Sequence, residues 1–419
     1  MDVEVERAAA GWVAMDSILS QLSADTTDDS SICMAIYDLG NAAASPGARM
    51  GHFLPNTAHF VEVDALQSQW FPCIARYEKV CELGSGHHGV VVKARNSVTG
   101  KIVALKTLHP KPLYHESDEE EEDDDEEENE EEEEEADPEV SRRVLREACF
   151  MAACRGHPSL VSISAIGRLP RTAQYCLIME HVGPSLYDVL VDQRGGKPFP
   201  ERDVRRMMRQ VMSGAKAMHD RGVVHRAIHP LNILVADGGA VFKIGDFGEA
   251  TSMAETDVPY EARLSYVAPE CLLCGTGCLN SEVSDSWSMG CLMLELLMGE
   301  DHFAVAEADD DDDYEGVLYK VFDVLGVPGK RTMQAIRPQD DDLARKVQQW
   351  RARQRRVGKQ RRSRLDDLVP CDALSEYGFE VLEGLLMINP KKRLTATAAL
   401  QLPWFTENTD DYSPAPQGD

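Results

Sequence analysis

Long apolar runs are absent from this chain of 419 residues, because nowhere do about 18 apolar residues follow one another, the length that a membrane-spanning helix needs. The first six residues include three acids and no base, and they lack the charged-then-apolar pattern of a signal peptide. We therefore expect a protein of the nucleus or cytoplasm with no membrane partner. The 11 cysteines are scattered and odd in number, which in a non-secreted chain predicts reduced thiols.

Basic residues are missing from one segment, residues 116–139, which holds 20 Asp or Glu and no Lys or Arg. The net charge of the whole chain is −29, so only −9 remains for the rest, and the acidity says little about a nucleic-acid partner; none is expected. Like charges repel, and the segment has nothing apolar to bury, so a disordered insert is predicted over residues 111–139. Ser117, which precedes acids, is either a site for an acidophilic modifying kinase or part of an inert spacer.

Residues 1–75 are predicted to form a partly disordered extension. Apolar side chains between Val5 and Leu22 recur at roughly helical spacing, and the polar stretch 23–31 follows them. The extension is either a partly ordered tail or a docking arm for a partner or for the body of the protein.

A glycine-rich turn lies between two predicted strands. Residues 77–83 alternate like a strand, residues 84–89 read Gly-Ser-Gly-His-His-Gly, and the β-branched run 90–92 follows. Glycines let backbone amides approach phosphate oxygens closely. In a dinucleotide-binding fold the same letters open a helix, whereas the β-branched run favours a second strand. The pattern therefore predicts a phosphate-binding turn between two strands.

A lysine follows this turn at a sequence spacing that is typical of an ATP-binding site. The predicted strand over residues 102–106 ends in Lys106, 15 residues after Val91. Alone, Lys106 is typical of an ordinary surface lysine. After a glycine turn at this spacing, it is predicted to contact the α- and β-phosphates of ATP.

Three further motifs come in order along the chain. Residues 225–232 read His-Arg-Ala-Ile-His-Pro-Leu-Asn, residues 246–248 read Asp-Phe-Gly, and residues 268–270 read Ala-Pro-Glu. With the glycine turn and Lys106, this set resembles the protein kinase superfamily over roughly residues 77–405, and the stretch from Gly84 to Lys106 resembles the cyclin-dependent Ser/Thr kinases (CMGC type).

The resemblance implies an α+β, bilobal kinase fold. A small β-rich lobe with one regulatory helix is expected over residues 77–182, and a larger, mostly helical lobe over residues 183–405. The second lobe would carry an acidic stretch at 307–315 and a basic stretch at 345–364. A C-terminal tail would occupy residues 406–419.

The same resemblance implies a site for ATP and Mg²⁺. Glu147, on the regulatory helix, would pair with Lys106, and Asn232 and Asp246 would hold the metal. Without the resemblance, Glu147 is typical of an exposed helix residue. Nucleotide contacts are expected at Leu83, Gly84, Ser85, Gly86, His87, His88, Gly89, Val91, Ala104, Lys106, Glu180 and Val182. His87 and His88 stand where the family carries a phosphorylatable Thr and Tyr, so that mode of inhibition is expected to be absent.

The catalytic loop departs from the family at two positions. Ala227 stands where the family has the Asp that accepts the substrate proton, and His229 stands where it has a Lys. We therefore predict an ATP-binding pseudokinase, or a very weak kinase, that acts as a scaffold or regulator. Two alternatives stay open: an active Ser/Thr kinase that transfers the ATP γ-phosphate to protein hydroxyls, and a diverged paralogue without a function of its own.

The activation segment, residues 249–267, also differs from the family. Val258 occupies the position of the phosphorylated Thr, and Thr256 is flanked by acids that would repel a phosphate. Activation is therefore predicted not to depend on phosphorylation of this segment. A substrate-facing Thr of the family is replaced by Arg263. Residues 143–147 match only the end of the family's cyclin-contacting sequence, so the implied partners are a protein substrate or a partner kinase, with cyclin binding left open.

Other residues are given structural roles by the resemblance. Asp285 would anchor the backbone of the catalytic loop, and Glu270 would pair with Arg393. Cys271, Cys274 and Cys278 indicate either a zinc site that lacks a fourth ligand or an ordinary kinase loop. The basic stretch 345–364 is a solvated helix face, a nuclear localisation signal or a clasp for the acidic insert.

Overall fold

The computed structural model describes residues 74–86, 89–109, 137–169, 174–255, 263–274, 281–305, 313–336, 341–356 and 363–407. The chain divides into two compact units, one made of Met1–Gly156 and Val161–His181, the other of His157–Leu160 and Val182–Asp419. Predictions for residues 1–73, for the acidic insert up to residue 136, and for His87, His88, Thr256, Val258 and Cys278 fall outside the described residues. No helix in the described ranges is long and apolar enough to cross a membrane.

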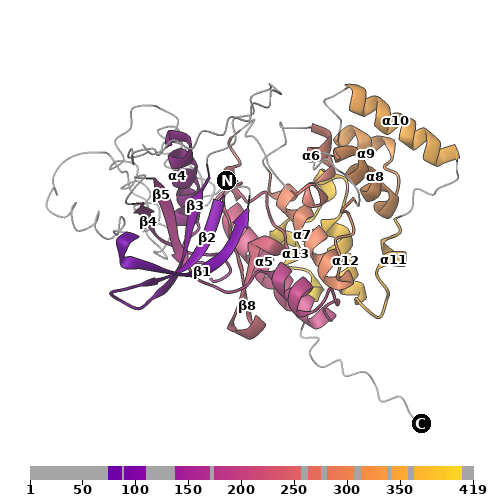
Figure 1. The fold of residues 1–419 in the computed structure, drawn as a ribbon. Helices are drawn as coiled ribbons and strands as arrows, with labels where there is room; N and C mark the ends of the chain where they lie inside the picture. The colour runs from indigo at the N-terminus through magenta and orange to yellow at the C-terminus, as the bar shows by residue number, and fades with distance from the viewer. Residues whose placement is uncertain are drawn as a thin grey trace, which may run out of the picture. The chain divides into compact units, whose positions relative to one another are not determined.

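The first unit contains a five-stranded antiparallel sheet (Figure 1). Its strands are β1 (Tyr77–Gly86), β2 (Gly89–Asn96), β3 (Ile102–Leu108), β4 (Ile163–Arg168) and β5 (Tyr175–Glu180), preceded by the 3-10 turn η1 (Ile74–Arg76). The strand order is β1-β2-β3-β5-β4. Strands β2, β3, β4 and β5 contribute one buried hydrophobic cluster, made of Ala94, Val103, Leu105, Ala165 and Ile178. The predicted arrangement of strand, glycine turn and strand is confirmed.

One long helix, α4 (Pro138–Ala153), accompanies the sheet. Asp137 caps it by accepting a hydrogen bond from the backbone N of Glu139 at 2.8 Å, and Pro138 occupies its first turn. The predicted apolar stripe is buried: Val140, Val144, Leu145, Cys149 and Phe150 are at most 4% exposed. The helix contacts β3, β4 and β5 through this stripe, so the predicted regulatory helix is present at the expected place.

The second unit is mainly helical. Its helices are α5 (Glu201–His219), α6 (Pro269–Cys274), α7 (Glu282–Met298), α8 (Tyr314–Leu325), α9 (Lys330–Ala335), α10 (Asp341–Arg356), α11 (Leu365–Leu368), α12 (Glu376–Leu385), α13 (Ala396–Ala399) and α14 (Pro403–Thr406). Two short antiparallel pairs join β6 (Val223–Val224) to β9 (Thr251–Ser252) and β7 (Ile233–Ala236) to β8 (Val241–Ile244). A short π-helix is η2 (Asp188–Gln193), and 3-10 turns are η3 (Pro230–Asn232), η4 (Asp237–Gly239), η5 (Leu264–Tyr266) and η7 (Pro390–Lys392). The two units together have the bilobal α+β composition of a protein kinase, as predicted.

The core of the second unit forms around α5 and α7. The predicted methionine-rich stripe of α5 is buried, and it consists of Val204, Met207, Met208, Val211, Met212, Ala215 and Met218. Helix α7 is buried along most of its length and packs closely on α12, since a Cβ added at Gly290 would lie 2.8 Å from the side chain of Leu386. These two helices provide the rigid base on which the loops of the site are held.

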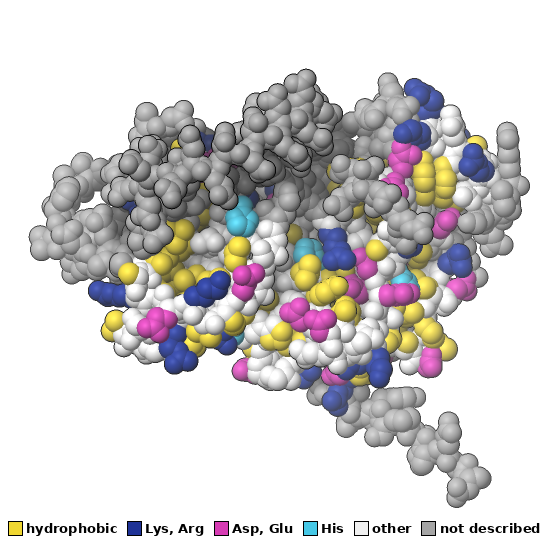
Figure 2. Space-filling model, viewed as in Figure 1, with side chains coloured by type: hydrophobic (Ala, Val, Ile, Leu, Met, Phe, Trp, Pro, Cys, Tyr) yellow, Lys and Arg dark blue, Asp and Glu magenta, His cyan; other side chains and the backbone are white. Residues whose placement is uncertain are grey.

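A charged helix, α10, covers the first part of the predicted basic stretch 345–364. In α10, Val347 is fully buried, and the Trp350 ring stacks on the Tyr319 ring with centroids 5.1 Å apart. Arg345 and Arg353 are exposed, and Figure 2 shows Lys and Arg side chains gathered over this helix at the upper right. For these residues the interpretation as a solvated face is correct, whereas the localisation signal and the clasp stay predictions.

Of the three cysteines after the Ala-Pro-Glu motif, only Cys271 can be compared with the predictions. Cys271 is disulfide-bonded, so the expectation that all cysteines are reduced is wrong for this residue. The side chain of Cys274 lies outside the described part of the chain, as does all of Cys278. Among the residues that the structure describes, no three His, Cys, Asp or Glu side chains form a group that could hold a metal ion. The zinc hypothesis for the three cysteines therefore stays untested.

Candidate functional site

The first unit joins Lys106 to Glu147 in a buried ion pair. Lys106 lies on β3 and Glu147 on α4, and the Lys106 Nζ is 2.9 Å from each carboxylate oxygen of Glu147. Lys106 is 5% exposed and Glu147 is 1% exposed. The two alternatives, a surface lysine and an exposed helix Glu, are therefore excluded, and the register of α4 relative to β3 is the one that the resemblance implied.

The glycine turn sits next to this pair in the sheet. Val91 of β2 is opposite Lys106 of β3, and Ala104 of β3 is buried opposite Met179. A Cβ added to Gly84 or Gly86 would meet no atom within 4 Å, so packing does not explain these two glycines. They leave the backbone of β1 open to close approach, as phosphate binding requires.

Gly89 has a different, structural reason to be glycine. Its φ is +151°, and a Cβ at this position would lie 2.0 Å from the carbonyl oxygen of Thr107. Only glycine allows β2 to begin this close to β3. The third glycine of the motif thus serves the sheet, while Leu83, which is 45% exposed, and Ser85 lie on the open strand β1.

At the end of β5, the side chain of Glu180 forms a hydrogen bond within the first unit. The Glu180 Oε1 accepts a hydrogen bond from the backbone N of Ser162 at 2.8 Å, and the Glu180 N donates to the Ser162 carbonyl at 3.0 Å. Its carboxylate and its N–H are thus both used within the first unit, and the nucleotide contact expected at Glu180 stays a prediction. Val182, the next residue of the predicted set of nucleotide contacts, belongs to the second unit.

In the second unit, a single carboxylate holds the catalytic loop. Asp285 is fully buried in α7, and its two oxygens accept hydrogen bonds from the backbone N of His225, the backbone N of Arg226 and the Nε2 of His219, each at 2.8 Å. Burial alone would raise the pKa of Asp285, but the hydrogen bonds and charges of His219 and His225 hold it below its usual value. The predicted anchoring role of Asp285 is confirmed.

His225 ties this loop to the Asp-Phe-Gly motif. Its ring is fully buried, its Nε2 lies 3.1 Å from the carbonyl oxygen of Gly245, and its edge packs on the Phe247 ring at 5.0 Å. Arg226 and Asp246 have φ values of +64° and +58°, an uncommon backbone conformation for residues other than glycine. Such conformations persist where the surroundings determine them strongly, as the hydrogen bonds of Asp285 and His225 do here.

The two substituted positions of the loop lie side by side with Asn232. The Asn232 Nδ2 donates to the carbonyl oxygen of Ala227 at 3.0 Å and lies 3.3 Å from the His229 Nε2. Burial, followed by the positive charge of Arg263, lowers the pKa of His229 to about 4, so this imidazole is neutral near pH 7. Ala227 is 8% exposed and ends in a methyl group. Ala227 therefore provides no proton acceptor, and the neutral His229 provides no cation.

Asn232 and Asp246 are held near one another by the backbone. The Gly245 N donates to the Asn232 carbonyl at 2.8 Å, and the Asp246 Oδ1 accepts from the Gly248 N at 3.2 Å. A carboxylate and an amide oxygen are the hard donors that Mg²⁺ prefers. The donor chemistry at this place therefore fits magnesium.

Glu249 was not predicted as part of the site. The Arg226 Nε donates to the Glu249 carbonyl at 2.6 Å, and an Arg226 guanidinium nitrogen lies 3.9 Å from the Glu249 carboxylate. The Arg226 side chain is 8% exposed and that of Glu249 16%. The signal in the sequence was an acid directly after Asp-Phe-Gly, but spacing alone does not indicate that Arg226 turns toward it.

Glu295 was also missed, although it is the acid in an otherwise apolar stretch of α7. It is 6% exposed and accepts a hydrogen bond from the hydroxyl of Tyr266, whose ring packs 5.7 Å from the ring of His229. Burial, reinforced by the charge of Asp301 and opposed by Arg263, raises the pKa of Glu295 to about 7. A titratable group is thus connected through Tyr266 to the substituted loop.

A second buried ion pair stabilises this unit away from the loop. The Arg393 guanidinium donates to both carboxylate oxygens of Glu270, at 2.6 and 2.8 Å, across 123 residues of sequence. This two-pronged geometry is the strongest form of an arginine–carboxylate contact. The predicted pair of Glu270 and Arg393 is confirmed.

Comparison with known proteins gives the family. Residues 77–405 match the family model described as the protein kinase domain. A rice protein named "Putative cyclin-dependent kinase F-2" (Oryza sativa subsp. japonica) is 38% identical over 340 residues, which are 79% of this chain and 90% of the rice protein. Cyclin-dependent kinase 4 of Xenopus laevis is 30% identical over 80% of this chain and 91% of its own length. Cyclin-dependent kinase G1 of Arabidopsis thaliana is 30% identical over 80% of this chain, which spans 49% of that relative. The chain therefore belongs to the protein kinase family and is a protein of the cyclin-dependent kinase type.

Proposed function

We propose that this protein binds ATP with Mg²⁺ and transfers phosphate very weakly or not at all, and that it acts as a scaffold or regulator of a protein partner such as an active kinase. The observation that carries the proposal is the contrast between the buried pair of Lys106 with Glu147 and the loop at Ala227 and His229. The groups that bind nucleotide are retained, while the groups that act on the substrate hydroxyl are replaced.

The first unit has groups suited to phosphate, and the second unit has groups suited to a metal ion. Lys106, kept in position by Glu147, would contact the α- and β-phosphates, and the open backbone at Gly84 and Gly86 would approach phosphate oxygens. Asn232 and Asp246 would hold the metal through hard oxygen donors. When bound, Mg²⁺ neutralises charge on the phosphates.

The weak transfer follows from what the loop cannot do. A methyl group at position 227 accepts no proton and does not orient a hydroxyl, and loss of a general base typically costs about 10²–10⁴ in rate. A neutral His229 adds no positive charge beside the transferred group, where charge stabilises the transition state. Both losses act on the chemical step and leave the contacts to ATP in place.

The deciding experiment measures phosphate transfer from labelled ATP with Mg²⁺ by the purified full-length chain. Asp246→Ala controls for contaminating kinases, and Ala227→Asp, with and without His229→Lys, tests the loop. We expect a silent or nearly silent wild type and a gain of about 10²-fold or more in the repaired variants. Transfer by wild type that Asp246→Ala abolishes would establish the alternative function, an active Ser/Thr kinase.

Nucleotide binding separates the proposal from the third possibility, a diverged paralogue. We expect the wild type to bind ATP with a dissociation constant well below the millimolar range, and Lys106→Met to weaken it about tenfold or more. Lys101→Met, at an exposed lysine near the start of β3, is the matched control. Affinity only in the millimolar range, without any stable protein partner, would favour the diverged paralogue.

The localisation and the protein partner belong to the same proposal. We infer residence in the nucleus or cytoplasm, which microscopy of a tagged full-length chain would test. A cyclin is one candidate partner, and co-purification with a panel of cyclins is the direct assay. Loss of the interaction after charge reversal on the exposed face of α4, for example Arg142→Glu, would place the partner on that helix.

A further inference from the structure

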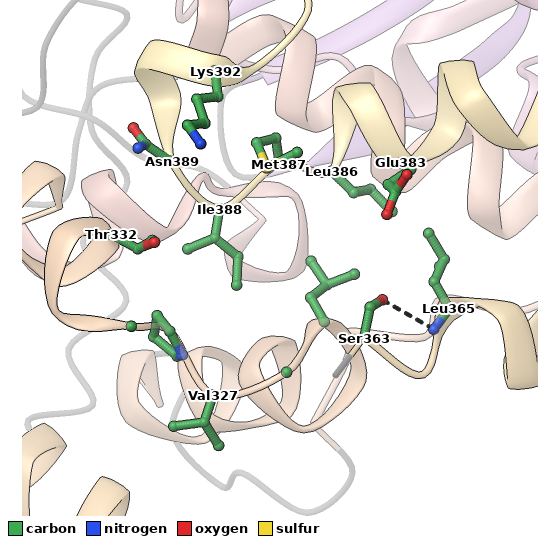
Figure 3. Close-up of a pocket in the computed structure, with 14 residues that line it drawn as sticks. Val327, Thr332, Ser363, Leu365, Glu383, Leu386, Met387, Ile388, Asn389 and Lys392 are labelled. Atoms are coloured by element: carbon green, nitrogen blue, oxygen red, sulfur yellow. Dashed lines mark hydrogen bonds between the residues drawn. The ribbon is translucent and has the colours of Figure 1, made fainter. Parts of the chain in front are cut away.

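A small cavity in the second unit has no part in the proposed nucleotide site. It lies between the turn from Gly326 to Gly329, the first turn of α9, the residues around Leu365 and the connection from α12 to η7 (Figure 3). Its volume is about 230 Å³. That is room for about seven water molecules at ~30 Å³ each, and it is smaller than the ~300–1,000 Å³ of pockets for drug-sized ligands. The size suits one large side chain.

The chemistry of the walls is divided between an apolar centre and charged ends. Aliphatic side chains line the centre, among them Val327, Leu386 and Ile388, which are 8% exposed or less. Figure 3 shows Lys392 at one end of the cavity and Glu383 at the other, with Ile388 between them. Both charged residues are exposed, so their charges flank an apolar hole rather than fill it.

The end that holds Lys392 is strongly cationic. Lys391 precedes Lys392, and both are exposed. Thr332 lines the cavity on the same side in Figure 3, and it follows two exposed cations, Lys330 and Arg331, in the first turns of α9. Lys392 thus lines the cavity itself, and three further exposed cations, Lys330, Arg331 and Lys391, lie within two residues of lining residues in the sequence. An anionic group placed at this end would be attracted by Lys392 and, at longer range, by the other three.

We propose that this cavity is a docking site for a short acidic peptide of a protein partner, which inserts one large apolar side chain between Val327 and Ile388 and places its acidic residues beside Lys391 and Lys392. A single buried anchor with charged neighbours is a common way for a folded domain to bind a peptide. The cavity would hold the apolar anchor, and the cations would orient the peptide by attracting its acidic residues. The site lies within the second unit, so it functions whether or not the protein transfers phosphate.

Gly329 gives a way to close the cavity without disturbing the fold. It lines the cavity with an extended backbone at φ −72° and ψ 175°, and a Cβ added there meets no atom within 4 Å. Gly329→Phe therefore attaches a side chain at the cavity wall through a Cβ that meets no neighbour, and its ring is large enough to occupy the cavity. Lys392→Glu reverses the charge at the cationic end, and Lys197→Glu, at an exposed lysine before α5, is the matched control for net charge.

The test selects peptides from a phage-displayed random library on the immobilised full-length chain and measures the affinity of a selected peptide by fluorescence anisotropy. We expect enrichment of peptides that combine one Leu, Phe or Met with adjacent acids. Gly329→Phe and Lys392→Glu should each weaken binding about tenfold or more, Lys197→Glu less than about twofold, and salt should weaken it steadily.

Several results would overturn the proposal. A selection that yields no such peptides, or peptides that bind Gly329→Phe as well as wild type, would show that the cavity is not the site. Equal weakening by Lys197→Glu and Lys392→Glu would show unspecific attraction to net charge. If removal of residues 408–419, which include Asp410, Asp411 and Tyr412, increased peptide affinity tenfold, the occupant would be the tail of the chain itself and not a partner. Circular dichroism and the unfolding midpoint of each variant verify its fold.

Discussion

Lys106 and Glu147, 41 residues apart in the sequence, are joined at 2.9 Å by both carboxylate oxygens and are almost completely removed from solvent. A pair this deeply buried recovers its desolvation cost only if both partners stay in place. The pair therefore fixes the position of α4 on the sheet of the first unit as well as the place of a charge that would face ATP phosphates.

Removal of one member of this pair should destabilise the first unit. Glu147→Ala leaves the Lys106 ammonium buried without its carboxylate, and such a change typically costs about 3–5 kcal/mol. Urea unfolding followed by fluorescence would measure it. Glu82→Ala, which breaks an exposed pair with Lys79 at 3.9 Å, is the control and should cost less than about 1 kcal/mol. Equal effects of the two variants would contradict the account.

The imidazole of His229 should stay neutral across the physiological range. Its pKa is lowered from 6.5 to about 4, chiefly by burial, so NMR should show no titration of its ring between about pH 5.5 and pH 8. The resonance is assigned by its loss in His229→Gln, and in urea the same ring should titrate near its ordinary value. A midpoint near pH 6.5 in the folded protein would mean that His229 carries charge when needed and can replace the family's lysine.

The buried Glu295 should make stability fall as pH rises. Its folded pKa is about 7 against an ordinary value of 4.5, so between these values the folded protein keeps a proton that the unfolded chain releases. The free energy of unfolding should therefore decrease by about 3 kcal/mol from pH 4.5 to pH 7 and then level off. Glu295→Gln should remove this slope in urea unfolding, whereas Glu380→Gln, at an exposed acid of α12, should keep it.

The contact of Arg226 with Glu249 should make the nucleotide site independent of phosphate on the activation segment. Arg226→Lys loses the 2.6 Å hydrogen bond that holds the backbone after Asp246, and we expect ATP–Mg²⁺ affinity to fall about tenfold. Phosphatase treatment and Thr256→Ala should change that affinity less than twofold. High phosphate occupancy at Thr256 in cells, together with weaker ATP binding by Thr256→Ala, would refute the prediction.

Local sequence was enough to predict the elements that carry the nucleotide half of the site. Glycine spacing, β-branched runs and the Asp-Pro start of α4 each indicate an element within a short window, and their order along the chain then placed Lys106, Glu147, Asn232 and Asp246 by resemblance. The contacts of Glu249 and Glu295 were not predictable in this way. These contacts depend on the directions of side chains and on burial between segments that are distant in sequence, such as Tyr266 and α7. A local sequence pattern contains no information about either.

The glycines of the motif also show that local sequence does not reveal contacts between distant segments. Residues 84, 86 and 89 form one motif by their letters, yet Gly89 is required by the carbonyl of Thr107 on a neighbouring strand, and Gly84 and Gly86 meet nothing. Substitution at Gly89 should therefore impair the sheet, whereas substitution at Gly84 should impair only what approaches β1. An interpretation based on spacing alone gives all three glycines the same role, contact with the ligand.

The carboxylate of Asp285 makes the opening rate of the catalytic loop depend on the opening rate of the protein core. The amide hydrogens of His225 and Arg226 are both donated to a fully buried side chain in the first turn of α7, about 60 residues further along the chain. They can exchange with solvent only when α7 itself opens, so they should rank with the slowest-exchanging amides of the molecule rather than with those of surface loops. A segment that has lost its proton acceptor has thus kept the rigidity of a working one, and its shape remains available for recognition by other proteins.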